Sequence, residues 1–315
     1  MKTHMGDASP EKNVPLAHLH RYRDLVDDFE AFMAAADRPL DRVVWANTRR
    51  VSAQAVERVV QGRCPEAKAL TWREGAWRLP PDARPGKWPE YLTGWLHGQE
   101  EAALWAVDVL DPQPGERVLD LCAAPGNKTA QIALAMQGRG TLVANERRFD
   151  RLSALRRTLD RLGMTSAVVT HEDGLTFPEL PGGYDRVLAD VPCTCEGTSR
   201  KAEGRRRKGA EGHRRWVVGV QRGLLRRALK LVKPGGVVVY ATCTYAPEEN
   251  EGVLDGIDPS VAVIEPVTPP EGLTVTPGIL DWGSDRYRPD VVHGMRMWPH
   301  HNDTGGFFVA RLRRL

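Results

Sequence analysis

The chain has 315 residues, of which 41% are hydrophobic and 27% are charged, and its net charge at pH 7 is +3. This is a globular composition, long enough for one large domain or two unequal ones, and its mild basicity permits a polyanionic partner without requiring one. The first residues lack an apolar signal core, and no stretch approaches the ~18 apolar residues that cross a membrane, so we expect a cytoplasmic protein. Five cysteines without the spacing of a disulfide framework fit that compartment.

The first 85 residues alternate between helical and extended patterns, which predicts a small α+β domain. Its expected elements are an amphipathic helix over 22–36, a strand over 41–48 and a helix over 53–61. Ser52 is the expected N-cap of the second helix, and Gly62 is expected to lie just beyond its end.

A stretch dense in proline and glycine, residues 79–90, predicts a linker. We therefore expect an accessory domain over residues 1–85 and a second domain over residues 86–315. A helical pattern over 93–110 leads into the second domain.

From residue 117 onwards, apolar runs alternate regularly with helical patterns. Strands are predicted at 117–121, 141–146, 166–174, 184–190, 237–242 and 306–314, and helices at 129–138, 149–163 and 214–232. Strands that alternate with helices predict an α/β fold with a mostly parallel sheet and helices on both faces. Ligands bind such sheets at the carboxyl ends of the strands, near the topological switch point.

The loop after the first of these strands, "DLCAAPGNKT" (120–129), has the features of a nucleoside-binding loop. It is built of small residues and leads into a helix whose N-terminus can face a polar ligand, but it lacks the glycine patterns of phosphate-binding loops. Glu146 ends the next strand, where an acid typically binds ribose hydroxyls, and Asp173 ends the third strand, where it can meet an adenine amine. We predict S-adenosylmethionine as the cofactor; a tight turn with two solvated acids is the alternative.

Three further motifs follow that loop: "DVPCTCEG" (190–197), "YATCTYAPEEN" (240–250) and "RMWPHHNDTGGFFVAR" (296–311). In order and spacing, the four motifs together resemble the RNA cytosine-C5 methyltransferases of the Nol/Nop/Sun group, which includes the bacterial Rsm-type ribosomal RNA enzymes and archaeal tRNA enzymes. The resemblance implies a class I S-adenosylmethionine-dependent methyltransferase with a Rossmann-like fold. It begins at about residue 91, and the segment before it resembles the family's small accessory domain only loosely.

The chemistry of this family explains cysteines at the ends of two strands. C5 of cytosine is a weak nucleophile, and addition of a thiolate at C6 turns the ring into an enamine whose C5 can attack a methyl sulfonium. An acid must serve N3 during the addition, and a base must then remove the C5 proton. By resemblance, Cys243 is the nucleophile, Cys193 assists product release and Asp190 holds the cytosine edge and the N3 proton. DNA cytosine methyltransferases attack with the thiol of the Pro-Cys motif instead, and spacing alone does not choose between the two.

The resemblance also implies a set of cofactor-binding positions. These are Cys122, Ala123, Ala124, Pro125, Gly126, Asn127, Lys128, Glu146, Arg151, Asp173 and Asp190. Cys122 needs only to be small there, and Lys128 and Arg151 could equally be solvated helix residues. Cys195 departs from the family, which usually has glycine or another small residue. Because Cys-x-Cys without a partner histidine lacks the usual zinc spacing, we expect no metal.

Residues 200–215 carry eight lysines and arginines in sixteen positions. Such a run is usually a solvated face, but this one follows the Pro-Cys motif directly and therefore predicts an electrostatic grip on RNA. We expect a monomeric enzyme that forms 5-methylcytosine in ribosomal RNA, with tRNA as the alternative substrate. A DNA cytosine methyltransferase and a non-catalytic RNA-binding ribosome assembly factor are the competing hypotheses; the intact Cys243, Cys193 and Asp190 argue against the second.

Overall fold

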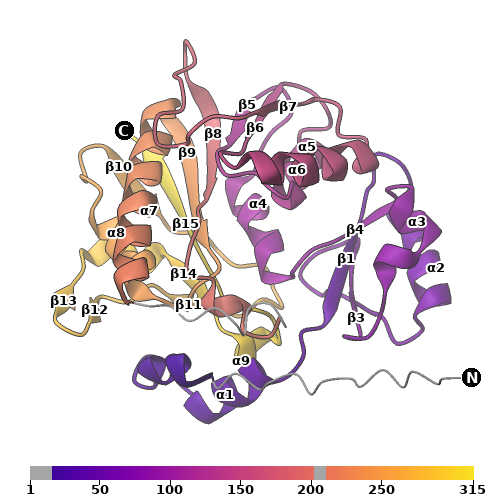
Figure 1. The fold of residues 1–315 in the computed structure, drawn as a ribbon, viewed down its shortest axis with the longest axis horizontal. Coiled ribbons are helices and arrows are strands. Elements are labelled where there is room, and N and C mark those ends of the chain that lie inside the picture. Colours follow the sequence, from indigo (N-terminus) through magenta and orange to yellow (C-terminus); the bar gives the residue numbers. More distant parts are fainter. Residues whose placement is uncertain (1–15, 202–210) are drawn as a thin grey trace, which may run out of the picture.

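The computed structural model describes residues 16–201 and 211–315. Within these residues the strands form a four-stranded sheet, a nine-stranded sheet and a two-stranded ribbon. Figure 1 shows the four-stranded sheet, from the N-terminal part of the chain, to the right of the larger sheet.

The chain enters the described part through a 3-10 helix, η1 (Leu16–Tyr22), and a helix, α1 (Phe29–Asp37). The prediction of one helix over 22–36 was therefore wrong in its first half. Asp28 is the reason, because it adopts an extended conformation and its side chain accepts a hydrogen bond from Ala31 N at 2.9 Å, which caps the helix there.

The four-stranded sheet has the order β2-β3-β1-β4. Its strands are β1 (Arg42–Ala46), β2 (Lys68–Ala69), β3 (Ala76–Leu79) and β4 (Leu96–Gly98), accompanied by α2 (Ala53–Arg63), η2 (Pro85–Lys87) and α3 (Pro89–Leu92). The predicted strand at 41–48 and the cap at Ser52 are confirmed, but Gly62 lies inside the last turn of α2 rather than beyond it.

Two expectations around the linker were wrong. Residues 79–90 fold into η2 and the start of α3, and the expected helix over 93–110 contains β4 before η3 (Ala102–Leu104) and α4 (Trp105–Leu110). β4 became a strand because β1 offers it an antiparallel edge. The first sheet is therefore complete only at Gly98, and the division into domains 1–85 and 86–315 stays a prediction.

The larger sheet has a parallel centre in the order β9-β8-β5-β6-β7. Its strands are β5 (Arg117–Asp120), β6 (Thr141–Asn145), β7 (Ala167–Thr170), β8 (Tyr184–Asp190) and β9 (Val232–Thr242), and the helices between them are α5 (Asn127–Ala135), α6 (Phe149–Leu162) and α7 (Glu211–Leu231). The α/β prediction is confirmed. Chain order runs outward in opposite directions from β5 and β8, so the switch point lies between these two strands.

An antiparallel extension completes the sheet. β15 (Phe307–Arg314), the predicted final strand, pairs with β9 on one edge and with β14 (Met295–Met297) and β10 (Ala262–Glu265) along the other. The remaining elements are η4 (Glu196–Thr198), η6 (Pro247–Glu249), α8 (Glu251–Asp255), β11 (Thr276–Pro277), β12 (Asp281–Trp282), β13 (Asp285–Arg286), η7 (Pro289–His293) and α9 (Pro299–Asn302).

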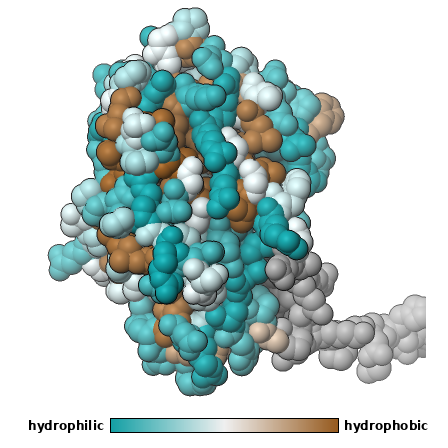
Figure 2. Space-filling model, turned by 90° about the vertical axis from the view of Figure 1, so that its left-hand side faces the viewer, coloured by the Kyte–Doolittle hydropathy of each residue, from teal (hydrophilic) through white to brown (hydrophobic). Residues whose placement is uncertain are grey.

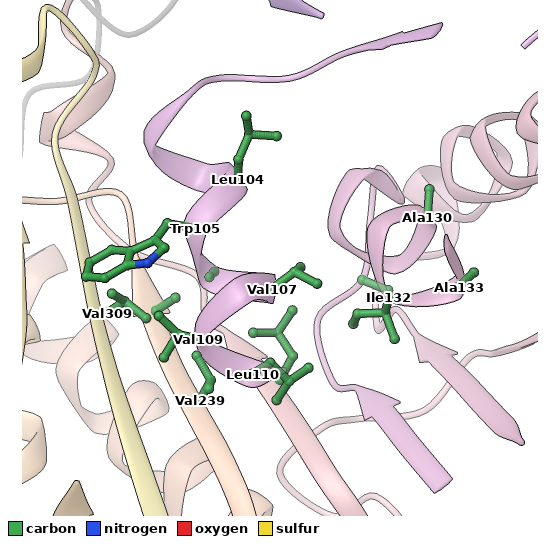
Figure 3. Close-up of a cluster of buried hydrophobic side chains, with 14 of the residues drawn as sticks. Leu104, Trp105, Val107, Val109, Leu110, Ala130, Ile132, Ala133, Val239 and Val309 are labelled. Carbon is green, nitrogen blue, oxygen red and sulfur yellow. The ribbon is translucent and has the colours of Figure 1, made fainter. Parts of the chain in front are cut away.

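Helices cover both faces of the larger sheet, with α7 and α8 on one side and α4, α5 and α6 on the other (Figure 1). Figure 3 shows how α4 fills the second side: Trp105 and Val109 face Val239 of β9 and Val309 of β15, and Val107 points toward α5. Each such side chain contributes about 1.5–3 kcal/mol on burial. This packing fixes the strand ends that carry the sequence motifs.

Aromatic side chains join the N-terminal helices to the larger sheet. Tyr22 and Phe32 pack against Tyr245 and Trp298, which stack on each other with ring centroids 5.4 Å apart. We call these four residues the aromatic junction. The Tyr22 hydroxyl also donates to the Glu196 carboxylate, so the N-terminal segment contacts both cysteine motifs.

Hydrophilic residues dominate the face of the molecule shown in Figure 2, with separate apolar patches between them. Among the helices of residues 16–201 and 211–315, none has the length and apolar character needed to cross a bilayer.

Candidate active site

A cavity of about 270 Å³ opens where β5, β8 and β9 end. Asp120 and Asp190 reach it from the ends of β5 and β8, and Cys243 follows β9. Because β15 runs antiparallel to β9, its first residue, Phe307, lies at the same edge and also lines the cavity. The cavity thus lies at the topological switch point, where ligands bind open α/β sheets.

Lys128 and Asp190 form an ion pair inside this cavity. The Lys128 Nζ, in the first turn of α5, lies 2.7 Å from Asp190 Oδ2. Burial lowers the pKa of Lys128, but the Asp190 carboxylate outweighs it through charge and hydrogen bonding, and the net pKa is raised. Lys128 is therefore a protonated donor held against Asp190.

The two cysteine motifs bring three thiols together. Cys193 Sγ lies 3.3 Å from Cys243 Sγ and 3.7 Å from Cys195 Sγ. Gly197 N donates to the Cys243 carbonyl at 3.0 Å, which holds the two motif loops side by side. Of these thiols, Cys243 faces the cavity.

Both predicted catalytic thiols are protonated at neutral pH. Hydrogen bonds with the neighbouring thiols, followed by burial, raise the pKa of Cys193. The hydrogen bond with Cys193 lowers the pKa of Cys243, but contact with Cys195 and burial raise it more, so its net shift is upward. A thiolate forms at Cys243 only if substrate or a base takes the proton.

Asp120 presents an unused acceptor to the cavity. Its Oδ2 accepts a hydrogen bond from Thr129 Oγ1 at 2.6 Å, whereas its buried Oδ1 has no hydrogen-bond partner in the described parts of the chain. Burial raises the pKa of this carboxyl to about 7. A buried acceptor without a partner costs free energy unless a ligand supplies a donor, so the site fits a ligand that carries amino or hydroxyl groups.

The two predicted nucleoside acids differ in their surroundings. Glu146 is buried, accepts a hydrogen bond from Arg148 N at 2.8 Å and lies 3.1 Å from Arg151 Nη1; Arg151 in turn lines the cavity. The Asp173 side chain is 40% exposed, accepts a hydrogen bond from Leu175 N and lies 3.4 Å from Arg147. Glu146 is thus connected to the cavity through Arg151, whereas Asp173 lies at the surface.

The structure brings most predicted site residues to the cavity. Its lining includes Cys122, Ala123, Ala124, Pro125, Asn127, Lys128, Arg151, Asp190 and Cys243, and omits Gly126, Glu146, Asp173 and Cys193. Gly126 serves the turn instead: its φ is +102°, and a Cβ there would lie 3.0 Å from Leu155 Cδ1. Glycine is therefore required for the loop to approach α6.

The sequence analysis missed half of the cavity wall. The additional lining residues are Gln99, Glu100, Ala103, Asp120, Gly197, Thr198, Lys201, Gly306 and Phe307. Asp120, Gly197, Gly306 and Phe307 stood inside the quoted motifs, which was a usable signal. Gln99 carried no signal, because only the fold brings the segment after β4 to the cavity.

The four-stranded sheet supports the cofactor loop directly. His97 Nε2 of β4 lies 2.9 Å from Asn127 Oδ1, and Gln99 Nε2 donates to Gln131 Oε1 at 3.1 Å. Burial lowers the pKa of His97 to about 4, although the Asn127 contact opposes the shift. His97 is therefore a neutral side chain that joins the two sheets.

The fold and the site define a class I methyltransferase, an α/β enzyme with its cavity at the switch point of a mostly parallel sheet. Residues 107–313 match the family model described as 16S rRNA methyltransferase RsmB/F. The chain belongs to this family, and the predicted kinship with RNA cytosine-C5 methyltransferases is confirmed.

Similar proteins include both tRNA and rRNA enzymes. The chain is 34% identical to the tRNA (cytosine(49)-C(5))-methyltransferase of Pyrococcus abyssi, over 94% of this chain and 95% of the relative. It is also 34% identical to the ribosomal RNA small subunit methyltransferase F of Erwinia tasmaniensis, over 92% of this chain but 60% of that protein. A crystal structure of a methyltransferase homolog from Pyrococcus horikoshii superimposes with a TM-score of 0.78 at 29% identity, covering 95% of this chain and 99% of that one.

Proposed function

We propose that this protein transfers a methyl group from S-adenosylmethionine to C5 of a cytosine in RNA. The observation that carries the proposal is the meeting of Cys243, Asp190 and Lys128 in one cavity, with Cys193 3.3 Å behind the Cys243 thiol. A nucleophile, a carboxylate and a proton donor are the groups that methylation at C5 requires.

The cofactor would lie along the loop 122–125 and the first turn of α5. There the small side chains leave room for a ligand, Asp120 offers its unpartnered oxygen, and Arg151 connects the cavity to buried Glu146. When bound, S-adenosylmethionine supplies an electrophilic methyl group on a sulfonium. Asp173, which is more exposed, would contribute at the rim.

Addition to the base would begin at Cys243. As its Sγ bonds to C6 of cytosine, electron density moves onto N3, which then needs a proton. Asp190 would hold that edge of the base, and protonated Lys128, 2.7 Å away, adjoins it as a donor. After methylation, removal of the C5 proton expels Cys243 as a thiol, and Cys193 is the adjacent group that would assist this release.

The basic run at 200–215 supports RNA as the polymer, although its residues 202–210 lie outside the described parts of the chain. Its ends have different roles. Arg200 is buried and donates to the carbonyls of Thr304 and Pro39, and Arg214 lies 2.8 Å from Glu196, whereas Lys201 lines the cavity. Arg200 and Arg214 anchor the run, and Lys201 would meet the phosphate backbone.

Ribosomal RNA is the first candidate substrate, because the matching family model describes rRNA enzymes. Transfer RNA is the second, because the archaeal tRNA enzyme is matched over 95% of its length, whereas the bacterial rRNA relative extends well beyond the matched part. Bisulfite sequencing of both RNA classes, from cells with and without the gene, tests the proposal. A 5-methylcytosine that disappears with the gene identifies the substrate, and its absence from both classes would refute RNA methylation.

The roles of the two thiols are tested with labelled RNA on denaturing gels. Cys243→Ala should abolish both methyl transfer and any covalent adduct, whereas Cys193→Ala should still attack and methylate, and accumulate a denaturant-resistant complex because elimination stalls. Cys195 lies 3.7 Å from Cys193 and could replace it, so the Cys193/Cys195 double alanine variant belongs in the set. An adduct formed by Cys243→Ala but absent from the double variant would reverse the two roles.

A further inference from the structure

Three cysteine thiols from two separate loops meet at one side of the cavity. The Sγ atoms of Cys193, Cys195 and Cys243 all lie within 4.8 Å of one another. The spacing Cys-x-Cys alone did not suggest a metal centre, because the third thiol comes from the end of another strand, where only the fold places it. The arrangement is a three-thiol cluster, not a pair.

The separations match those of thiolates around one small cation. Zinc–sulfur bonds of about 2.3 Å with tetrahedral angles place two sulfurs about 3.8 Å apart. The distance from Cys193 Sγ to Cys195 Sγ is 3.7 Å, and that to Cys243 Sγ is 3.3 Å. Side-chain rotations that move the sulfurs by a few tenths of an ångström would therefore form three zinc–sulfur bonds, with water in the fourth position.

Cys195 holds a conformation that disfavours any side chain. Its φ is +59°, in the left-handed region where a Cβ clashes with the backbone and glycine is free of strain. A strained residue that persists beside an active site is a reason to look for a function of its side chain. Here the side chain adds a third sulfur to two others.

We propose that Cys193, Cys195 and Cys243 form a binding site for a thiophilic divalent cation, with Zn²⁺ as the ion that fits best. Binding forms three metal–sulfur bonds and releases the three thiol protons to solvent. Cys243 faces the cavity, so the ion has an entry path, and the Lys128 ammonium in the same cavity compensates the net negative charge of three thiolates around a divalent ion. A bound ion occupies the Cys243 sulfur, and under the proposed function it would block attack on cytosine.

The test is metal binding by the full chain, reduced with a non-thiol reductant and freed of metal. Cd²⁺ is titrated while the ultraviolet thiolate-to-cadmium absorption is recorded, and the Zn²⁺ affinity is measured by competition with a chromophoric chelator. We expect one ion per chain. Cys195→Ser should weaken Zn²⁺ binding by at least about tenfold, the smaller end of the loss caused by removing even an outer-shell partner of a metal.

Two further variants separate binding from folding. Cys195→Gly suits the positive φ, so its melting temperature should equal or exceed that of the parent while the cadmium band weakens. Cys64→Ser removes a buried thiol far from the cluster, in the first sheet's core, and should leave Zn²⁺ affinity unchanged. Equal affinity in parent and Cys195 variants, equal loss in Cys64→Ser, or no bound ion would each overturn the site. Because the readout is metal binding, its outcome is independent of whether RNA is methylated.

Discussion

Asp120→Asn should make the stability of the protein less sensitive to pH while it weakens the cofactor site. Asp120 is 1% exposed, and burial raises its pKa from 3.8 to about 7. The folded protein therefore retains a proton that the unfolded chain releases above about pH 4. Stability falls as pH rises from 4 to 7, because the folded state binds more protons than the unfolded state over that range.

The size of the effect follows from the shift. About three pKa units at 1.36 kcal/mol each correspond to about 4 kcal/mol of unfolding free energy, lost between pH 4 and pH 7. Asparagine cannot ionise, and its side-chain oxygen can still accept the hydrogen bond from Thr129. The variant's advantage over the parent should thus grow by about 4 kcal/mol across this range.

The assay is unfolding in urea at pH 4 to 8, with the free energy extrapolated to water for both proteins. Calorimetry at pH 8 should show weaker binding of S-adenosylmethionine by the variant, by about 1–3 kcal/mol, since the unpartnered Oδ1 acceptor is replaced by a donor. Parallel pH profiles for the two proteins would refute the argument that Asp120 is protonated by burial. Unchanged cofactor affinity would refute its place in the cofactor site.

Other substitutions test the remaining parts of the site. Glu146→Gln should weaken S-adenosylmethionine binding more than Asp173→Asn, because only Glu146 is buried; calorimetry giving the reverse order would contradict this. His97→Gln should remove an acid-induced loss of up to about 3 kcal/mol between pH 6.5 and 4, since the parent's neutral His97, with its pKa of about 4, must gain a proton on unfolding in that range; unfolding curves with unchanged pH slopes would argue otherwise. Alanines at 205–208 should flatten the salt dependence of RNA binding by about 0.7–0.9 log units per lost phosphate contact and leave cofactor affinity unchanged, and an unaltered slope would make the run a solvated surface.

The sequence predicted the parallel half of the larger sheet because its strands and helices carry strong, uninterrupted patterns. β5 to β9 lie in the core, and buried strands must be apolar along their whole length. β4 was misread as helix because its three residues, 96–98, acquire strand geometry only by pairing with β1. β14 and β11 escaped notice for the same reason: short antiparallel strands depend on a partner edge more than on their own sequence.

The site shows the same division. The loop 120–129 and the two cysteine motifs were found because covalent chemistry needs those residue types at those strand ends. The ion pair between Lys128 and Asp190 and the partnerless oxygen of Asp120 depend on three-dimensional distances that spacing does not encode. Gln99 reaches the cavity only because two sheets meet there.

The aromatic junction has a consequence for how the chain can be divided. The family model begins at residue 107, yet Tyr245, two positions after the candidate nucleophile, is buried under Tyr22 and Phe32. A fragment that starts at 107 would expose these rings to water and release Glu196 from its Tyr22 partner. The N-terminal helices therefore belong to the catalytic folding unit, and neither part can be exchanged between relatives without the other.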